Sequence, residues 1–118
     1  MKDDREMQPD EEAHGGHTIL RIQAPRLDAS KASDLREVLV DLIVGGQQSI
    51  ILDLEMVEFM DSAAMSALIT AVKKLGPFGT ISVAAVRFPV ARLFSITKMD
   101  RIFPITATVD EAINSLAA

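Results

Sequence analysis

The 118-residue sequence contains no cysteine, tryptophan or tyrosine, and its only aromatic residues are five phenylalanines. Without cysteine, the chain has no disulfide framework, no thiolate zinc site and no cysteine nucleophile. An aromatic content of 4% makes platforms for stacking nucleic-acid bases unexpected. The uncharged apolar runs are shorter than the roughly 20 residues that a membrane-spanning helix needs. We therefore expect no insertion into a membrane.

Positive charge is also scarce. The net charge is −5, and residues 1–12 account for −4 of it, so the rest of the chain is nearly neutral. A nearly neutral body does not offer the basic surface that binding of nucleic acid needs, so nucleic acid is not an expected partner. The acidic N-terminal stretch also lacks the apolar core of a secretion signal. We therefore expect a cytoplasmic protein.

Length and a hydrophobic content of 48% predict one domain with a single modest core. Residues 1–16 are predicted to form an acidic polar tail, in which the composition leaves room for a short edge strand, and residues 17–118 to form the domain. Four apolar runs predict strands, and Pro104 confines the last of them to an edge or an end of the sheet. The predicted strands span 18–23, 49–54, 80–86 and 102–106.

Four helices are predicted between and after these strands, each from apolar residues at helical spacing. Their start and stop signals are, in chain order, Asp28 or Ser30 to Gly45-Gly46, Asp61-Ser62 to Gly76-Pro77, a start at Pro89, and the capping box from Thr108 to Glu111. Helical crossovers between apolar strands imply parallel neighbours. The predicted class is therefore an α/β sheet.

The densest polar cluster lies between the second predicted strand and the second predicted helix. Its members are Asp53, Glu55, Glu58, Asp61 and Ser62. In an open α/β sheet, function usually sits at this edge. One interpretation is a Mg²⁺ site made by the carboxylates. The other is a helix start, capped by Asp61, that presents the Ser62 hydroxyl to another protein.

Short side chains line the outer face of that second helix. A spacing of four leads from Ser62 to Ser66 and Thr70, and Ala63 and Ala67 lie alongside. Small residues let another backbone approach at little cost in side-chain entropy, which favours a docking surface. Alanine is also a strong helix former, so the pattern alone leaves both explanations open.

The sequence shows no signature of catalysis or cofactor binding. It has neither a glycine-rich dinucleotide motif nor a P-loop, and no base is spaced to serve a nucleophile. His14 and His17 flank two glycines, but no third ligand is placed beside them, and zinc sites use three or four. We predict no enzymatic activity, no cofactor and no metal site.

Two separated segments resemble the STAS family, which includes anti-sigma factor antagonists and domains of sulfate transporters. They are ILDLEMVEFMDS at 51–62 and RLFSITKMDRIFPI at 92–105, and the resemblance extends over residues 17–117. It implies a single α/β domain with a four- to five-stranded mixed sheet and about four helices, largely on one side.

The resemblance also implies that the protein acts by partner switching. In such a system an unphosphorylated antagonist binds an anti-sigma factor that is also a serine kinase, which frees the sigma factor. Phosphorylation from ATP, on a serine that follows an aspartate, releases the antagonist, and a separate serine phosphatase resets it. On this chain the serine is Ser62, and the residues expected to bind the partner are Glu58, Asp61, Ser62, Ala63 and Ser66.

One position departs from the family pattern, and it leaves an alternative open. The family usually has glycine two residues after the phosphorylated serine, where this chain has Ala64. The alternative is a family member that binds its partner constitutively. Arg92, Lys98 and Arg101 are either partner contacts or solvated surface charges.

Two further alternatives change the function. One is a STAS regulatory or scaffold subunit of a transporter or stressosome-like complex. The other is a phospho-receiver domain that uses Asp53 with Mg²⁺. A receiver also needs an acidic pair after its first strand and a Lys-Pro on a late strand, whereas here Asp3-Asp4 precede every predicted strand and Lys98 is followed by Met99. The sequence leaves the oligomeric state open.

Overall fold

Strands and helices alternate along the chain in the computed structural model, which describes residues 9–116. The elements are β1 (Asp10–His14), β2 (His17–Arg21), β3 (Arg26–Leu27), α1 (Ala29–Val44), β4 (Ser49–Asp53), β5 (Phe59–Met60), α2 (Ser62–Leu75), β6 (Thr80–Ala84), α3 (Phe88–Ile96), the 3₁₀ helix η1 (Met99–Arg101), β7 (Ile105–Thr106) and α4 (Val109–Leu116).

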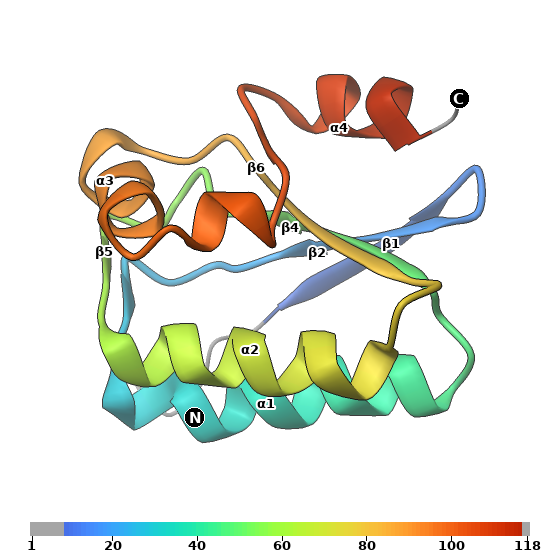
Figure 1. Cartoon of the computed structure of the whole chain (residues 1–118), viewed down its shortest axis with the longest axis horizontal. Coiled ribbons are helices and arrows are strands. Elements are labelled where there is room, and N and C mark those ends of the chain that lie inside the picture. Colours follow the sequence, from blue (N-terminus) through green and yellow to red (C-terminus); the bar gives the residue numbers. More distant parts are fainter. Residues whose placement is uncertain (1–8, 117–118) are drawn as a thin grey trace.

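Five of the strands form one mixed sheet in the order β1-β2-β4-β6-β7. Only the β1–β2 pairing is antiparallel. The long helices α1 and α2 cover one face of this sheet, and α4 lies on the other (Figure 1). The third helix, α3, packs into the core of the α1–α2 side through Val90 and Phe94. The expected α/β fold, with its helices largely on one side, is confirmed.

Both faces of the central strands are buried, because side chains alternate between the two helical layers. Leu20, Leu52 and Val83 are neighbours across the strands and belong to the large core under α1 and α2. Ile19 and Ile51 point to the other face, into a smaller core with α4. Burial on both sides explains why these strands are near-continuous apolar runs in the sequence.

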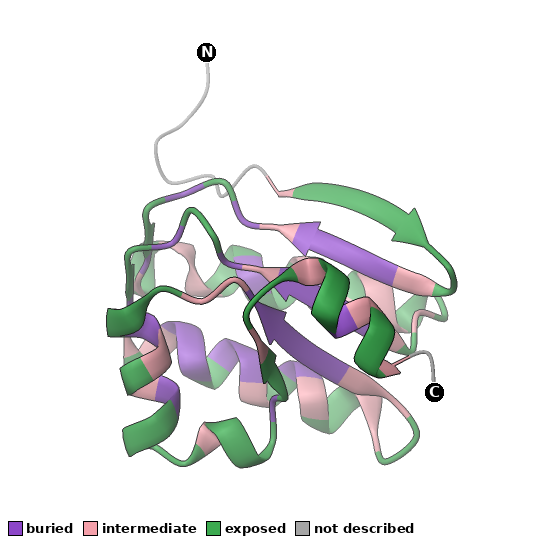
Figure 2. Ribbon diagram, turned by 90° about the horizontal axis from the view of Figure 1, so that it is seen from above, coloured by how far each residue is buried: buried purple, intermediate pink, exposed green. Residues whose placement is uncertain are grey.

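The sheet begins at Asp10, ahead of the predicted domain boundary at residue 17. All five residues of β1 are exposed (green in Figure 2), so no apolar alternation marks this strand in the sequence. Backbone pairing to β2 holds it, through a turn in which Gly15 and Gly16 have positive φ angles of 57° and 85°. Two such residues in succession are typical of a tight hairpin turn. Residues 1–8 of the expected tail lie outside the described residues.

The last predicted strand is shorter than expected. Residues 102–106 are predicted as a strand, but β7 holds only Ile105 and Thr106, at the sheet edge that Pro104 predicts. The N–H groups of Ile102 and Phe103 both donate to the Met99 carbonyl, at 2.9 Å, in the turn that closes η1. They are therefore committed to a turn and do not pair with β6.

No helix within residues 9–116 has both the length and the apolar character that crossing a membrane requires.

We expect the Phe94 side chain to be a main support of the core. It is fully buried and meets Phe103 edge-on, with ring centroids 6.0 Å apart. Phe94→Ala should lower the free energy of unfolding by about 3–5 kcal/mol in urea denaturation. Phe78 is 90% exposed, and Phe78→Ala should stay within about 0.5 kcal/mol of the parent. Equal effects from the two substitutions would contradict this assignment of the core.

Candidate functional site

A short parallel ladder between β3 and β5 sets the position of the candidate site. The N–H groups of Glu58 and Phe59 donate to the Pro25 carbonyl at 2.7 and 3.1 Å, and the Asp61 N–H donates to the Leu27 carbonyl at 3.1 Å. The ladder thereby brings the start of α2 beside the start of α1. Each strand has two residues, too few for a periodic pattern, and the sequence did not predict them.

The Asp61 carboxylate joins the starts of both helices. Its Oδ1 accepts the Ala64 N–H at 3.1 Å, which caps α2. Its Oδ2 accepts the N–H of Ala29, the first residue of α1, at 3.0 Å. The predicted capping role is confirmed, and the bond to Ala29 adds a link between helices that sequence spacing did not reveal.

The start of α1 has its own cap. Of the two predicted candidates, Asp28 is the N-cap, and its Oδ1 accepts both the N–H and the hydroxyl of Ser30, at 3.1 and 2.6 Å. The hydroxyl bond is the main reason why the pKa of Asp28 lies below its ordinary value, with Lys31 and Arg26 nearby adding to the effect. The ionised cap therefore stabilises the fold above the ordinary pKa of an aspartate. This contribution is lost as pH falls through the lowered value.

Ser62 is the first residue of α2 and is exposed. Backbone N–H groups and the helix dipole at this position favour a negatively charged group. Glu58, in the segment that leads to β5, is exposed as well. A solvent-accessible hydroxyl therefore sits at a helix start whose backbone Asp61 fixes.

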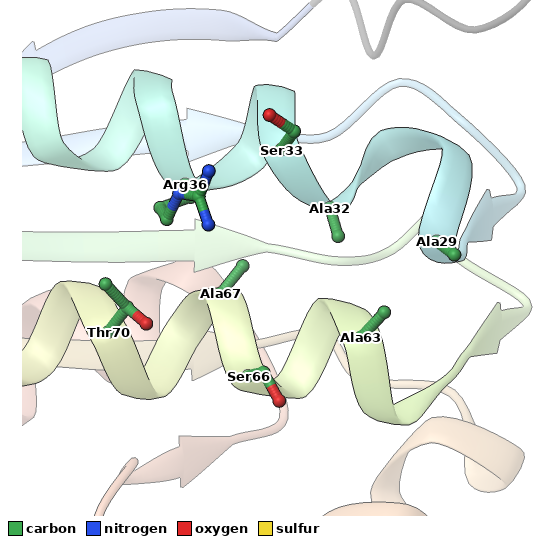
Figure 3. A pocket seen from close by; sticks show the side chains of 8 residues that line it. All are labelled: Ala29, Ala32, Ser33, Arg36, Ala63, Ser66, Ala67 and Thr70. Carbon is green, nitrogen blue, oxygen red and sulfur yellow. The ribbon is translucent and has the colours of Figure 1, made fainter.

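The other two residues expected to bind the partner, Ala63 and Ser66, line a groove between α1 and α2 (Figure 3). The groove encloses about 340 Å³. Arg36 is its one long side chain. Its complete lining is Ala29, Ala32, Ser33, Arg36, Ala63, Ser66, Ala67 and Thr70. Four of the short side chains predicted on the second helix thus form one wall of a groove whose other wall is α1, namely Ala63, Ser66, Ala67 and Thr70. Ser62 is not part of the lining, and Ala67, expected on the outer face, is buried because it packs into the core.

Ala64 occupies the position where the family usually has glycine. It is fully buried and belongs to the large core, while its N–H reaches Asp61. The extra methyl group is accommodated by packing within a regular helix. This chain therefore has no need of glycine's conformational freedom at this position.

Asp53 has a structural environment of its own. Its carboxylate lies 3.4 Å from Arg21 Nε and accepts the Glu55 N–H at 3.0 Å. Arg21 also contacts Glu12 at 2.8 Å and Asp10 at 3.3 Å, and the bond to Glu12 is the largest cause of its raised pKa. The carboxylates at this edge thus surround an arginine.

A metal site needs several ligands close together. No group of three or more histidine or acidic side chains within that range is arranged to hold an ion. His17 lies with Nδ1 2.7 Å from Ser49 Oγ, beside the turn at the opposite end of β2. The Mg²⁺ interpretation of the carboxylate cluster therefore has no ligand set in the described part of the chain.

The chain belongs to the STAS domain family, whose model matches residues 8–112. Among solved structures, it is similar to an anti-sigma factor antagonist from Mycobacterium paratuberculosis, with 24% identity, a TM-score of 0.85 and 94% of each chain covered. It is also similar to the phosphorylated form of SpoIIAA, a Bacillus cell fate determinant, with 20% identity, a TM-score of 0.70 and coverage of 92% of this chain and 98% of that one. A sulfate transporter family protein from Wolinella succinogenes matches with 20% identity, a TM-score of 0.73 and coverage of 87% and 86%. These similarities are similarities of fold. Membership of the STAS family replaces the interpretation of the chain as a phospho-receiver domain that uses Asp53.

Removing the Asp61 carboxylate should cost stability, because two backbone N–H groups lose their acceptor. We expect Asp61→Ala to lower the free energy of unfolding by roughly 1–2 kcal/mol. Asp61→Asn keeps one acceptor oxygen, so its effect should be smaller. Ser62→Ala is the matched control and should stay within about 0.5 kcal/mol of the parent in urea denaturation. If Asp61→Ala were as stable as Ser62→Ala, the bridging role would be wrong.

Proposed function

We propose that the protein is an anti-sigma factor antagonist that acts by partner switching. The unphosphorylated form binds an anti-sigma factor that is also a serine kinase, and phosphorylation of Ser62 releases it. The observation that carries the proposal is the exposed Ser62 hydroxyl at the first position of α2. Family membership and structural similarity to an anti-sigma factor antagonist support it.

The modification is a phosphoryl transfer between the two proteins. Ser62 Oγ attacks the γ-phosphorus of ATP, a new O–P bond forms, and the bond to the β-phosphate oxygen breaks to release ADP. The hydroxyl proton passes to a base of the kinase. This chain supplies only the nucleophile and a rigid place for it, so we propose no catalytic activity of its own. A separate serine phosphatase hydrolyses the phosphoserine and resets the cycle.

Charge gives the switch its direction. A phosphate adds about −1.5 to −2 charges and three acceptor oxygens at the point where the partner approaches. Within the chain, the start of α2 tolerates that charge. At an interface the phosphate has to be desolvated beside Glu58 and Asp61, which are already acidic. A hundredfold loss of affinity needs only about 2.8 kcal/mol, so the fold need not change.

A second function keeps the fold and changes the partner. The structural similarity to a sulfate transporter family protein favours a regulatory subunit of a membrane transporter. Purification of the tagged protein from its own cells separates the two functions. Recovery with a soluble serine kinase supports the antagonist, and recovery with a membrane complex supports the transporter subunit.

Substitutions at Ser62 should each hold the protein in one of the two proposed states, binding or released. We expect Ser62→Ala to bind the anti-sigma factor constitutively, and Ser62→Asp to bind at least about tenfold more weakly, because a carboxylate imitates part of the phosphate charge. Isothermal titration calorimetry with a serine kinase recovered in that purification measures both. Ser115→Asp, at an exposed position of α4 on the other face of the sheet, is the matched control. Parent-like binding by both Ser62 variants would refute the switch.

Phosphate mapping tests the same site directly. After incubation with that kinase and ATP, mass spectrometry should find phosphate on Ser62 in the parent and none in Ser62→Ala. Phosphate on Ser66 instead, one turn further along α2, would show that Ser62 is not the site of the switch. Tight binding without any phosphorylation would favour the constitutive family member.

A further inference from the structure

Helix α3 exposes two large apolar residues on its outer face. Its inner face is committed to the core, where Val90 and Phe94 are buried. Its outer face carries Phe88 and Ile96, which are 74% and 66% exposed. A surface helix normally turns charged and polar residues to solvent. In this structure the outer face has no described element over it.

Helix α1 differs from α3, because its strongly exposed apolar residue, Val44, lies at its C-terminal end. The outward residues of α1 include Asp34, Glu37 and Asp41, which are charged and exposed, as on an ordinary solvated helix. After α3, the chain continues with a further exposed apolar residue, Ile102, at 47%. We call residues 87–102, which span α3 and η1, the α3–η1 surface. A local concentration of exposed apolar side chains is typical of an interaction site.

The α3–η1 surface is also basic, in a chain that is otherwise acidic. Residues 87–102 contain four cations and one carboxylate, for a net charge of +3, while the other residues sum to −8. Arg92 lies between Phe88 and Ile96 at a spacing of four, so the three share one helix face. Lys98 and Arg101 follow and are exposed. Positive charge thus lies between the exposed apolar residues of this surface and after them.

This surface lies beside the segment that leads into α2. Helix α3 packs beside β5, and β5 leads within two residues to Ser62 (Figure 1). Phe59 of β5 is 37% exposed, and the Arg26 guanidinium lies 4.1 Å from its ring centroid. The same pairing of apolar surface with a cation therefore extends from α3 toward Ser62.

We infer that the α3–η1 surface docks an apolar segment of the anti-sigma factor that is bordered by Asp or Glu side chains. The inference rests on the proposed function and names the chemistry of its partner. Carboxylates complement Arg92, Lys98 and Arg101, and they also explain why a phosphate on Ser62 disrupts the complex. An acidic partner attracted to α3 is repelled by a new negative charge next to it.

Polar substitutions of the exposed apolar residues test whether these residues contact the partner. Phe88→Ser and Ile96→Asn should each weaken binding to the anti-sigma factor at least about tenfold, because central apolar contacts dominate interface energies. The matched controls are Phe78→Ser and Val44→Asn, at residues 90% and 70% exposed away from this surface. The controls should bind as the parent does. Equal losses in all four variants, or in none, would overturn the inference.

Charge reversal at Arg92 tests whether positive charge contributes to docking. Arg92→Glu should slow association with the anti-sigma factor about tenfold at low salt and reduce the salt dependence of the rate. Lys73→Glu, in the last turn of α2, makes the same change of charge and should leave association near the parent rate. Equal slowing by Arg92→Glu and Lys73→Glu would show an effect of net charge alone and would overturn the proposed role of Arg92 in docking.

The remaining outcomes identify other occupants or separate the two proposals. A parent dimer in analytical ultracentrifugation that Phe88→Ser dissociates would show that a second copy covers the surface, which overturns the inference. Sedimentation with phosphatidylglycerol vesicles that Arg92→Glu abolishes would show a lipid surface, with the same consequence. If Ser62→Asp weakens binding and the α3 variants do not, the inference fails and the function stands. If the parent binds no anti-sigma factor, the function fails first.

Discussion

The Asp61 carboxylate is the constraint on which the site depends. Its two oxygens accept N–H groups from the starts of two helices that are 32 residues apart in sequence, Ala64 on α2 and Ala29 on α1. One side chain thus closes the junction that the β3–β5 ladder brings together. Because Ser62 directly follows Asp61, this junction fixes the position of Ser62 on the surface. We therefore expect an Asp61 substitution to change stability and the proposed docking together, so its effect on binding has to be compared with a measured free energy of unfolding.

Parallel topology explains why the site, the ladder and α3 gather at one end of the molecule. In an α/β sheet the carboxyl ends of parallel strands share one edge, and the following helices begin there. β4 leads through β5 into α2, and β6 leads into α3. The Phe94–Phe103 contact anchors the α3 segment in the core beneath its exposed face. Both halves of the proposed docking surface therefore rest on rigid elements, which favours a switch that acts through charge.

Sequence patterns predicted the elements that have an apolar pattern and missed those that have none. Apolar periodicity located the central strands and the helices, and local capping signals such as Asp61 marked the helix starts. β1 was left open because every residue in it is exposed, and β3 and β5 because two residues make no pattern. The bond from Asp61 to Ala29 is a long-range contact with no local signal. The same holds for the outer face of α3, since a sequence shows that Phe88 is apolar but not that it is left uncovered.

The buried Ala64 also bears on how the proposed switch works. A glycine here would loosen the first turn of α2, whereas alanine packs its methyl group into the core and favours regular helix. The turn that carries Ser62 is therefore held from beneath by packing and from its end by the Asp61 cap. A phosphate on so firmly held a serine has little freedom to be relieved by local rearrangement. In the proposed switch, the charge of that phosphate would act on the partner, and electrostatics at the interface would distinguish the two proposed states.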